Sequence, residues 1–197
     1  MNKFKKIIIS TQVFFLLNGC VIFKGNNLQK IELNQLEESS TRKKKIYVHW
    51  EMDFFPIAHS NINYVDREVL FKQALKDSKC CELVKKKSEA DLIFEGKAYD
   101  QRNPARFVGF LISAFTAYII PSWHVAKIFV TAEVKEGEKT FHYEVADSMT
   151  TVIWLPLVIA TPFAYNFDKT HKDILENSYR SVLLKMKNDL LFTKNNK

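Results

Sequence analysis

The chain has 197 residues, with 29 Lys and Arg against 22 Asp and Glu, a net charge of +7 and 47% hydrophobic residues. This composition is globular, and it excludes an intrinsically disordered, collagen-like or low-complexity protein. Three Cys are too few for a disulfide-stapled scaffold, and the length suits a single domain with a terminal extension.

Residues 1–19 have the pattern of an export signal, a hydrophobic N-terminal helix that is removed after secretion. Three Lys precede an apolar run at 7–17. That run is too short to span a bilayer, which takes about 20 residues. The segment ends Leu17-Asn18-Gly19-Cys20.

This junction resembles the lipobox of bacterial lipoproteins, in which a Leu stands three residues before the Cys and a small residue directly before it. Leu17 and Gly19 match these positions. The resemblance implies cleavage between Gly19 and Cys20, with diacylglycerol and an acyl chain such as palmitate attached to Cys20. It also implies a protein anchored in the cell envelope by its lipid. Val21, where an Asp would retain the protein in the inner membrane, favours the outer membrane.

Residues 20–43 contain Gly25-Asn26-Asn27 and charges of both signs, a composition that predicts a flexible tether. Part of this segment, such as 28–36, could form a short element. A single domain is expected at 44–192, followed by a short tail at 193–197. Its first strand is predicted at 45–50, where β-branched and aromatic residues follow one another.

A helix is predicted next, because Asn63 can cap it with Asp66 three residues on, and apolar residues recur at helical spacing. Those apolar residues are Val65, Val69, Leu70, Ala74 and Leu75. Two further strands are predicted at 79–84 and 91–99, separated by a charged turn.

The clearest local pattern is a β-hairpin at 126–134 and 139–147, where apolar and polar residues alternate on both strands. Gly137 in the connecting turn can adopt the positive φ that a short hairpin turn needs. A long helix follows at 171–191, with Thr170 and Asp173 placed as a capping box. Its inward stripe is predicted from residues at four-residue spacing, which are Ile174, Ser178, Val182, Met186 and Leu190. This order of elements predicts a two-layer α+β domain, a mainly antiparallel sheet with helices on one face.

Two segments without charged residues flank the hairpin, at 107–121 and 149–167. One explanation is that they form buried strands and a short helix in the core. A second is that each crosses the membrane, although as helices they would be only about 22 and 28 Å long. A third is partial insertion, in which they form an apolar surface that contacts a bilayer or a partner protein.

Four aromatic residues lie within or beside these segments, as aromatic residues do at membrane interfaces. They are Tyr118, Trp123, Trp154 and Tyr165. These four are therefore the candidate residues for contact with a membrane or a partner.

No catalytic or metal-binding motif is present. The five His do not fall at metal-ligand spacing, and Gly-x-Ser-x-Gly, Gly-x-Gly-x-x-Gly and P-loop patterns are missing. The sequence therefore predicts no metal, no cofactor beyond the lipid on Cys20, and no enzymatic activity. Cys80 and Cys81 are adjacent on a predicted strand, so their side chains are expected on opposite faces.

The function expected from these features is a structural or interaction role in the envelope, with the membrane and an envelope protein as partners. Removing residues 1–19 takes away three Lys and lowers the net charge from +7 to +4, which does not favour nucleic-acid binding. Two alternatives stay open. One is a periplasmic carrier of a lipid or other hydrophobic ligand, and the other is an integral membrane protein with two apolar crossings.

Overall fold

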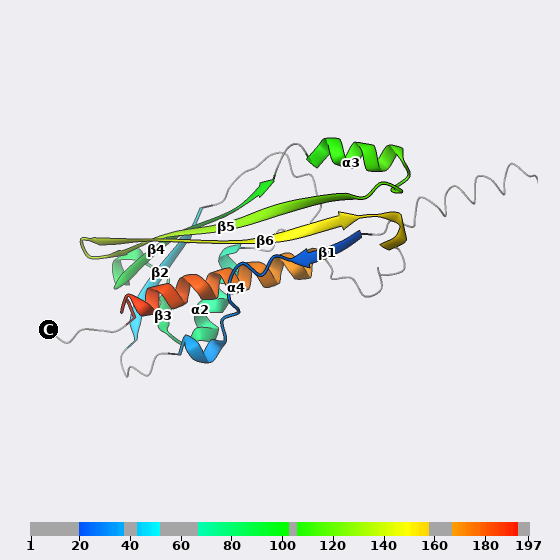
Figure 1. The fold of residues 1–197 in the computed structure, drawn as a ribbon. Helices are drawn as coiled ribbons and strands as arrows, with labels where there is room; N and C mark the ends of the chain where they lie inside the picture. The colour runs from blue at the N-terminus through cyan, green and yellow to red at the C-terminus, as the bar shows by residue number, and fades with distance from the viewer. Residues whose placement is uncertain (1–19, 38–42, 52–66, 103–105, 158–166, 193–197) are drawn as a thin grey trace, which may run out of the picture. The chain divides into compact units, whose positions relative to one another are not determined.

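The computed structural model describes residues 20–37, 43–51, 67–102, 106–157 and 167–192, drawn as a ribbon in Figure 1. The strands are β1 (Cys20–Lys24), β2 (Lys44–Trp50), β3 (Cys81–Val84), β4 (Leu92–Arg102), β5 (Ser122–Glu136) and β6 (Lys139–Ile153). The helices are α2 (Arg67–Ser78), α3 (Arg106–Phe115) and α4 (Phe167–Asn188), with short 3₁₀ turns η1 (Leu33–Gln35) and η2 (Lys87–Glu89). The predicted signal helix and C-terminal tail lie outside the described residues.

The six strands form one sheet in the order β1-β6-β5-β4-β2-β3. β1 is antiparallel to β6, and β5 and β6 are joined as a hairpin, whereas β2 is parallel to β3 and to β4. The parallel pairing follows from α2, which carries the chain from the end of β2 back to the start of β3. The predicted α+β class with a mainly antiparallel sheet is confirmed.

The chain divides into two compact units. Unit 1 comprises residues within 1–25, 102–126 and 149–170, and includes β1 and α3. Unit 2 comprises residues within 26–101, 127–148 and 171–197, and includes β2, β3, α2 and most of α4.

Unit 2 has an aromatic core between its sheet and two helices. Trp50 of β2 and Phe94 of β4 meet Phe71 of α2 and Tyr179 of α4, with ring centroids 4.1 to 5.9 Å apart. All four side chains are buried, so α2 and α4 cover the same face of this part of the sheet. A Cβ placed on Gly96 would lie 2.5 Å from the rings of Trp50 and Phe94, so the core requires glycine there.

The predicted strand at 45–50 and the predicted hairpin are confirmed, and both strands of the hairpin are longer than the alternating pattern indicates. Alternate residues of β5 are buried in unit 2, as predicted: Ile128, Val130, Ala132 and Val134. Gly137 has a φ of 58° in the connecting turn, which is the conformation that the sequence predicts for it.

Most of the apolar residues that were predicted to form the inward stripe of α2 are buried, but one of them is not. Leu70, Ala74 and Leu75 are buried as predicted, and Phe71 joins them. Val69 was expected in the stripe but is exposed, because it lies on the side of α2 away from the aromatic core. Asn63 and the other residues before Arg67 lie outside the described residues.

α4 begins earlier than predicted, at Phe167. Thr170 therefore lies in the first turn of the helix instead of capping it. Its hydroxyl is buried without a hydrogen-bond partner among the described residues. The apolar stripe of α4 is buried as predicted, except that Leu190 follows the end of the helix and is exposed.

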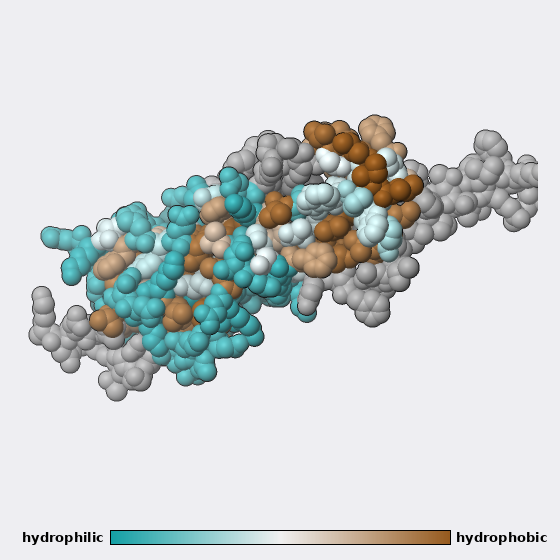
Figure 2. Space-filling view, in the orientation of Figure 1, coloured by the Kyte–Doolittle hydropathy of each residue, from teal (hydrophilic) through white to brown (hydrophobic). Residues whose placement is uncertain are grey.

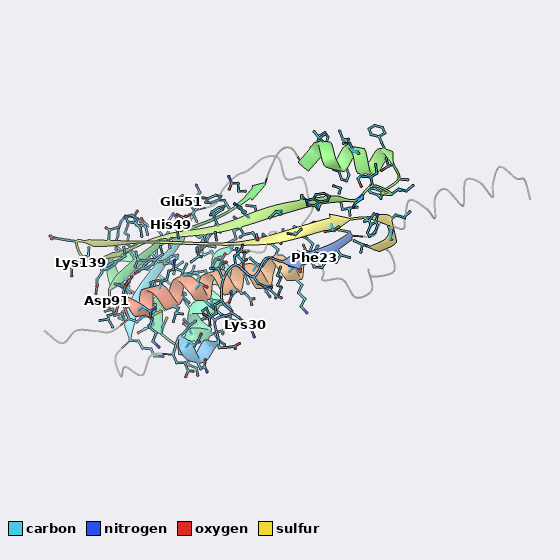
Figure 3. The ribbon with its side chains drawn as sticks, viewed as in Figure 1. Phe23, Lys30, His49, Glu51, Asp91 and Lys139 are labelled. Atoms are coloured by element: carbon cyan, nitrogen blue, oxygen red, sulfur yellow. The ribbon has the colours of Figure 1, made fainter. Side chains whose placement is uncertain are left out.

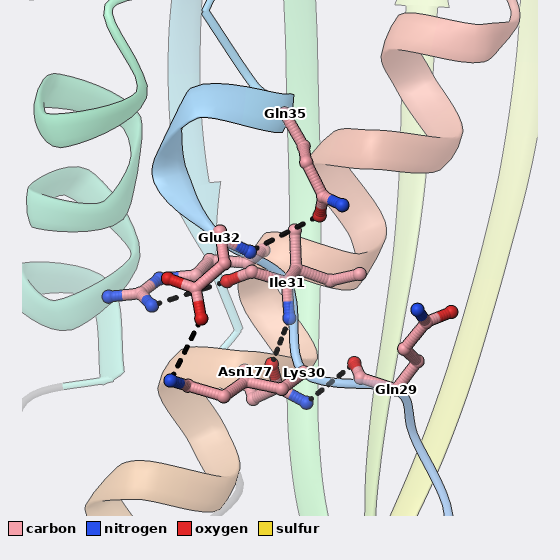
Figure 4. A network of polar contacts seen from close by, with 7 residues as sticks. Gln29, Lys30, Ile31, Glu32, Gln35 and Asn177 are labelled. Carbon is pink, nitrogen blue, oxygen red and sulfur yellow. Dashed lines mark hydrogen bonds and ion pairs between the residues drawn. The ribbon is translucent and has the colours of Figure 1, made fainter.

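Residues 20–37 are folded, which corrects the flexible tether expected at 20–43. Residues 20–24 form β1, and the segment after it is bound to α4. The Ile31 backbone N–H donates to Asn177 Oδ1 at 3.0 Å, and Asn177 Nδ2 donates to the Gln29 carbonyl at 3.2 Å (Figure 4). The side chains of Ile31 and Leu36 are buried. The apolar residues of this stretch form no regular period, so composition indicated a linker; the short element allowed at 28–36 is the turn η1.

Candidate functional site

Exposed apolar side chains are concentrated in unit 1. Among the described residues, every large hydrophobic residue that is exposed belongs to unit 1, except Val69 and Leu190. Figure 2 shows strongly hydrophobic residues gathered over α3. We call the following set the α3 surface: Phe107, Val108, Phe110, Leu111, Ile112, Phe115, Ile119, Ile120, Trp123 and Val125. Phe115 is the most exposed of them, at 88%.

The orientation of α3 is the reverse of an ordinary surface helix. Its inward side carries small residues: Ser113 is fully buried, and a Cβ on the exposed Gly109 would lie 3.9 Å from Ser122 Oγ of β5. Gly109 and Ser113 are four residues apart and so lie on one face of the helix. Ser113 Oγ donates to the Ile120 carbonyl at 2.8 Å. The large apolar side chains are therefore left on the outward faces.

The loop after α3 is fixed by hydrogen bonds within unit 1. Trp154 Nε1 donates to the Ile119 carbonyl at 3.0 Å, and the Leu155 backbone N–H donates to the Tyr118 carbonyl at 2.9 Å. Ala117 and Tyr118 end the helix with φ of 51° and 61°, in the left-handed region. Ile119 and Ile120 are therefore exposed on a loop whose backbone is held by these hydrogen bonds.

The four aromatic residues predicted for contact fall as follows. Trp123, 67% exposed, belongs to the α3 surface. Trp154 is also exposed beside the Ile119 loop, and Tyr118 is half-buried in that loop. These three lie in unit 1. Tyr165 lies outside the described residues.

The core explanation of residues 107–121 is wrong, because most of their side chains are exposed. The reason is their distribution: a helix that is apolar on all sides cannot bury every face against one part of a sheet. α3 has ten residues and is about 15 Å long, half the hydrocarbon thickness of a bilayer. None of the helices that the structure describes is long and apolar enough to cross a membrane. Residues 149–153 belong to β6, and 158–166 lie outside the described residues.

Cys20, the predicted lipidation residue, is the first residue of β1, and Gly19 before it lies outside the described residues. Cys20 is opposite Ile153 in the antiparallel register with β6. Partial burial raises the pKa of the Cys20 thiol above its ordinary value. Phe23, also on β1, is exposed (Figure 3). β1 thus brings Cys20 into the unit that carries the α3 surface.

The sequence predicts that Cys80 and Cys81 lie on opposite faces of one strand, and the structure shows a different arrangement. β3 begins at Cys81, and Cys80 lies in the turn before it. The two sulfur atoms are 3.0 Å apart. The prediction was wrong because Lys79, with a φ of 51°, turns the chain just before the pair.

Among the described histidines, His124 lies on β5 between Trp123 and Val125 of the α3 surface, whereas His142 and His171 have carboxylate partners in unit 2. His171 Nε2 is 3.3 Å from an Asp100 carboxylate oxygen, and His142 Nδ1 is 3.8 Å from Glu133. Within the described ranges, no three His, Cys, Asp or Glu side chains are grouped as a metal site requires. This part of the chain therefore gives no geometric support for a metal centre.

The sequence named tyrosines and tryptophans as contact residues but did not single out the other exposed members of the surface. Phe107, Phe115 and Ile119 are more exposed than most of the molecule's apolar residues. The sequence covered them only through three open explanations of 107–121, namely core, crossing or an apolar contact surface. A signal was available in Ser113, a small polar residue at helical spacing from Gly109 that marks the inward side of the helix.

No protein-family model and no curated protein matches this chain. Among solved structures, the chain is similar to the 2.35 Å crystal structure of a minor lipoprotein from Acinetobacter baumannii. The TM-score is 0.27 and the identity 10%, over 75% of this chain and 87% of that one. A likeness of this size is too slight to carry an argument about function.

Proposed function

We propose that this chain is a lipid-anchored protein of the bacterial cell envelope with a structural or interaction role and no catalytic activity. Acyl chains on Cys20 insert into the membrane, and the α3 surface contacts the same bilayer. The observation that carries the proposal is that unit 1 contains both Cys20 and nearly all the exposed large apolar residues of the described chain.

The anchor rests on the residues before Cys20. Leu17 and Gly19 suit the peptidase that processes bacterial lipoproteins, and the Cys20 thiol becomes a diacylglyceryl thioether. The new N-terminus is then acylated. Several acyl chains give firm attachment, because each buried methylene contributes about 0.8 kcal/mol. Val21 after the anchor favours the outer membrane.

The position of Cys20 leaves little chain between lipid and protein. Cys20 would be the first mature residue, and it already pairs with Ile153 of β6. Trp154, the residue after the end of β6, donates to the loop of the α3 surface. Acyl chains on Cys20 would therefore leave directly from the folded unit that carries the apolar residues, which supports contact of that unit with the bilayer.

The chemistry of the α3 surface favours lipid over a charged protein partner. Residues 107–126 contain no Asp, Glu, Lys or Arg, so the surface offers no ion pair to a partner. A short helix with apolar outward faces suits the boundary between headgroups and acyl chains. Trp123 and Trp154 are of the residue type that is enriched at that boundary.

The anchor is tested by metabolic labelling of the full chain with an alkyne-palmitate in a bacterial host. We expect label and membrane attachment in the wild type and in Cys81→Ser, which retains Cys20. Cys20→Ser should take up no label. Label that persists in Cys20→Ser would refute lipidation at Cys20.

Bilayer contact is tested separately, on a chain that starts at Val21 behind an ordinary cleavable export signal. The purified protein should float with vesicles of phosphatidylethanolamine and phosphatidylglycerol at about 3:1. Phe115→Asp should weaken the binding at least about tenfold, because it puts a charge where an apolar side chain would insert into the bilayer. Val69→Asp is the control, since Val69 is also an exposed apolar residue but lies in unit 2.

The labelling and flotation experiments test separate claims, so either claim can be refuted without affecting the other. If the Val21 chain does not float, or if Phe115→Asp and Val69→Asp behave alike, the α3 surface does not bind lipid. In that case a protein partner becomes the occupant to seek. Lipidation at Cys20 is decided by the labelling experiment whichever result flotation gives.

A further inference from the structure

Cys80 and Cys81 are held in contact at the end of α2. Their sulfur atoms lie 3.0 Å apart. A covalent disulfide needs about 2.05 Å, so an approach of about 1 Å would bring the two atoms to bonding distance. The contact exists because Lys79 turns the chain after α2 and Cys80 therefore precedes the strand.

The surroundings of the pair favour one thiolate. Ser78 Oγ lies 3.0 Å from Cys80 Sγ and 2.7 Å from the Leu75 carbonyl, and its proton can be donated to either. The hydrogen bond from Cys81 and the contact with Ser78 lower the pKa of the Cys80 thiol. The pKa of Cys81 is raised, chiefly because its proton is held by Cys80. The pair therefore releases one proton readily and keeps the other between the sulfurs.

The two cysteines differ in their exposure to solvent. Cys80 is fully buried, whereas Cys81 is partly exposed. Cys81 begins β3, which lies at the edge of the sheet and, among the described strands, pairs only with β2, where Cys81 lies opposite Lys44. An external reagent can therefore reach Cys81, and the Cys80–Cys81 peptide can change conformation without breaking pairs on two sides.

We propose that Cys80 and Cys81 form a reversible intramolecular disulfide by exchange with an external disulfide, small-molecule or protein. The Cys81 proton passes to the Cys80 thiolate as the Cys81 sulfur attacks one sulfur of the external disulfide, which gives a mixed disulfide on Cys81 and releases the first external sulfur as a thiolate. That thiolate takes the proton back from Cys80. The Cys80 thiolate then attacks the Cys81 sulfur, which closes the ring and releases the second external thiolate, and this takes from solvent the proton that the pair had released beforehand. The external disulfide gains two electrons and two protons, and the two cysteines lose them. This inference does not depend on the lipid anchor or on the α3 surface.

The test is titration of the purified full-length protein with glutathione disulfide, followed by trypsin digestion without reduction. Cleavage after Lys79 and Lys85 releases residues 80–85 as one peptide that contains both thiols. We expect this peptide to lose two hydrogens, with no attached glutathione, and to recover them on treatment with dithiothreitol. Any of three results would overturn the proposal: the two thiols stay reduced, each takes up one glutathione, or the disulfide forms between two chains.

Variants separate the two steps. Cys80→Ser should stop at the mixed disulfide, with one glutathione on Cys81. Ser78→Ala keeps both thiols but removes the hydroxyl beside Cys80, so ring closure should slow about tenfold relative to mixed-disulfide formation. Cys20→Ala, the control for the remaining thiol, should leave the product unchanged. Equal rates in Ser78→Ala and wild type would show that Cys80 is not the resolving thiolate.

Discussion

Trp154 Nε1 donates a hydrogen bond to the backbone carbonyl of Ile119, 3.0 Å away, and so joins the residue after β6 to the loop after α3. The Leu155 backbone N–H donates to the neighbouring Tyr118 carbonyl. Trp154 is thus more than an exposed aromatic residue. Its indole N–H helps to hold the loop that exposes Ile119.

Trp154→Phe removes this donor and keeps an aromatic ring. Because the bond is partly solvent-exposed, we expect a loss of about 0.5 to 1 kcal/mol in the free energy of unfolding, measured by urea titration. Trp123→Phe is the control, since Trp123 is more exposed, and it should change the value by less than about 0.5 kcal/mol. Equal losses in the two variants would contradict the role of the Trp154 bond.

Three glycines give a graded series of Gly→Ala variants. Gly96→Ala should destabilise unit 2 by about 1 to 3 kcal/mol or more, because its Cβ would overlap the rings of Trp50 and Phe94. Gly137→Ala should cost about 1 to 2 kcal/mol through its positive φ alone. Gly109→Ala has room for a Cβ within a helix and should stabilise the protein by about 0.5 to 1 kcal/mol. The opposite order in thermal unfolding would refute the packing around Gly96.

We predict that the ionisation of Tyr143 lowers the stability of the protein at alkaline pH. Burial, and then the hydrogen bond from its hydroxyl to Asp189 at 2.7 Å, raise the pKa of Tyr143 above its ordinary value. Above about pH 10 the unfolded chain releases the Tyr143 proton while the folded protein retains it, so stability falls as the pH rises. Near pH 8 the free energy of unfolding of the wild type should exceed that of Tyr143→Phe by about 1 kcal/mol.

That advantage should shrink when urea titrations are repeated near pH 11. Both proteins contain the same other tyrosines, so the difference between them isolates Tyr143. Asp189→Asn, which keeps an acceptor but removes the charge, should show a weaker decline than the wild type. A wild-type advantage that is constant with pH would mean that Tyr143 titrates as it does in the unfolded chain.

Asn177 holds the segment after β1 against α4, through bonds to Ile31 and Gln29. Asn177→Ala should raise the hydrogen-exchange rate of the Ile31 amide about fivefold, which corresponds to the loss of one hydrogen bond of about 1 kcal/mol. Asn188→Ala, at the exposed end of α4, should leave that rate unchanged. An unchanged rate in Asn177→Ala would show that Ile31 is held by its buried side chain alone.

Regular elements of the fold were predictable where one face is buried and the other solvated. The alternation in β5 and the four-residue spacing in α4 both follow from burial on one side, and both are confirmed. Residues 26–37 were not predictable in this way. Ile31 is buried through a partner, Asn177, that is far away in the sequence and leaves no local period.

The candidate surface was predictable in composition but not in orientation. The charge-free stretch marks residues 107–121 as unusual, but apolar content does not distinguish a core helix from an exposed one. The orientation depends on which residues face inward, here the buried Ser113, with Gly109 close to Ser122 of the sheet. The contact between Cys80 and Cys81 was likewise hidden, because it depends on the positive φ of Lys79.

The pairing of β1 with β6 would set an order on the maturation proposed for this chain. Cys20 lies opposite Ile153, so β1 cannot complete its place in the sheet until residues far along the chain are present. Under the proposed lipidation, acylation needs an accessible Cys20 thiol, whereas this thiol is partly buried once β1 has paired. Lipid transfer would then compete with closure of the sheet edge, and a chain that folded before it was acylated would be trapped as an unprocessed precursor.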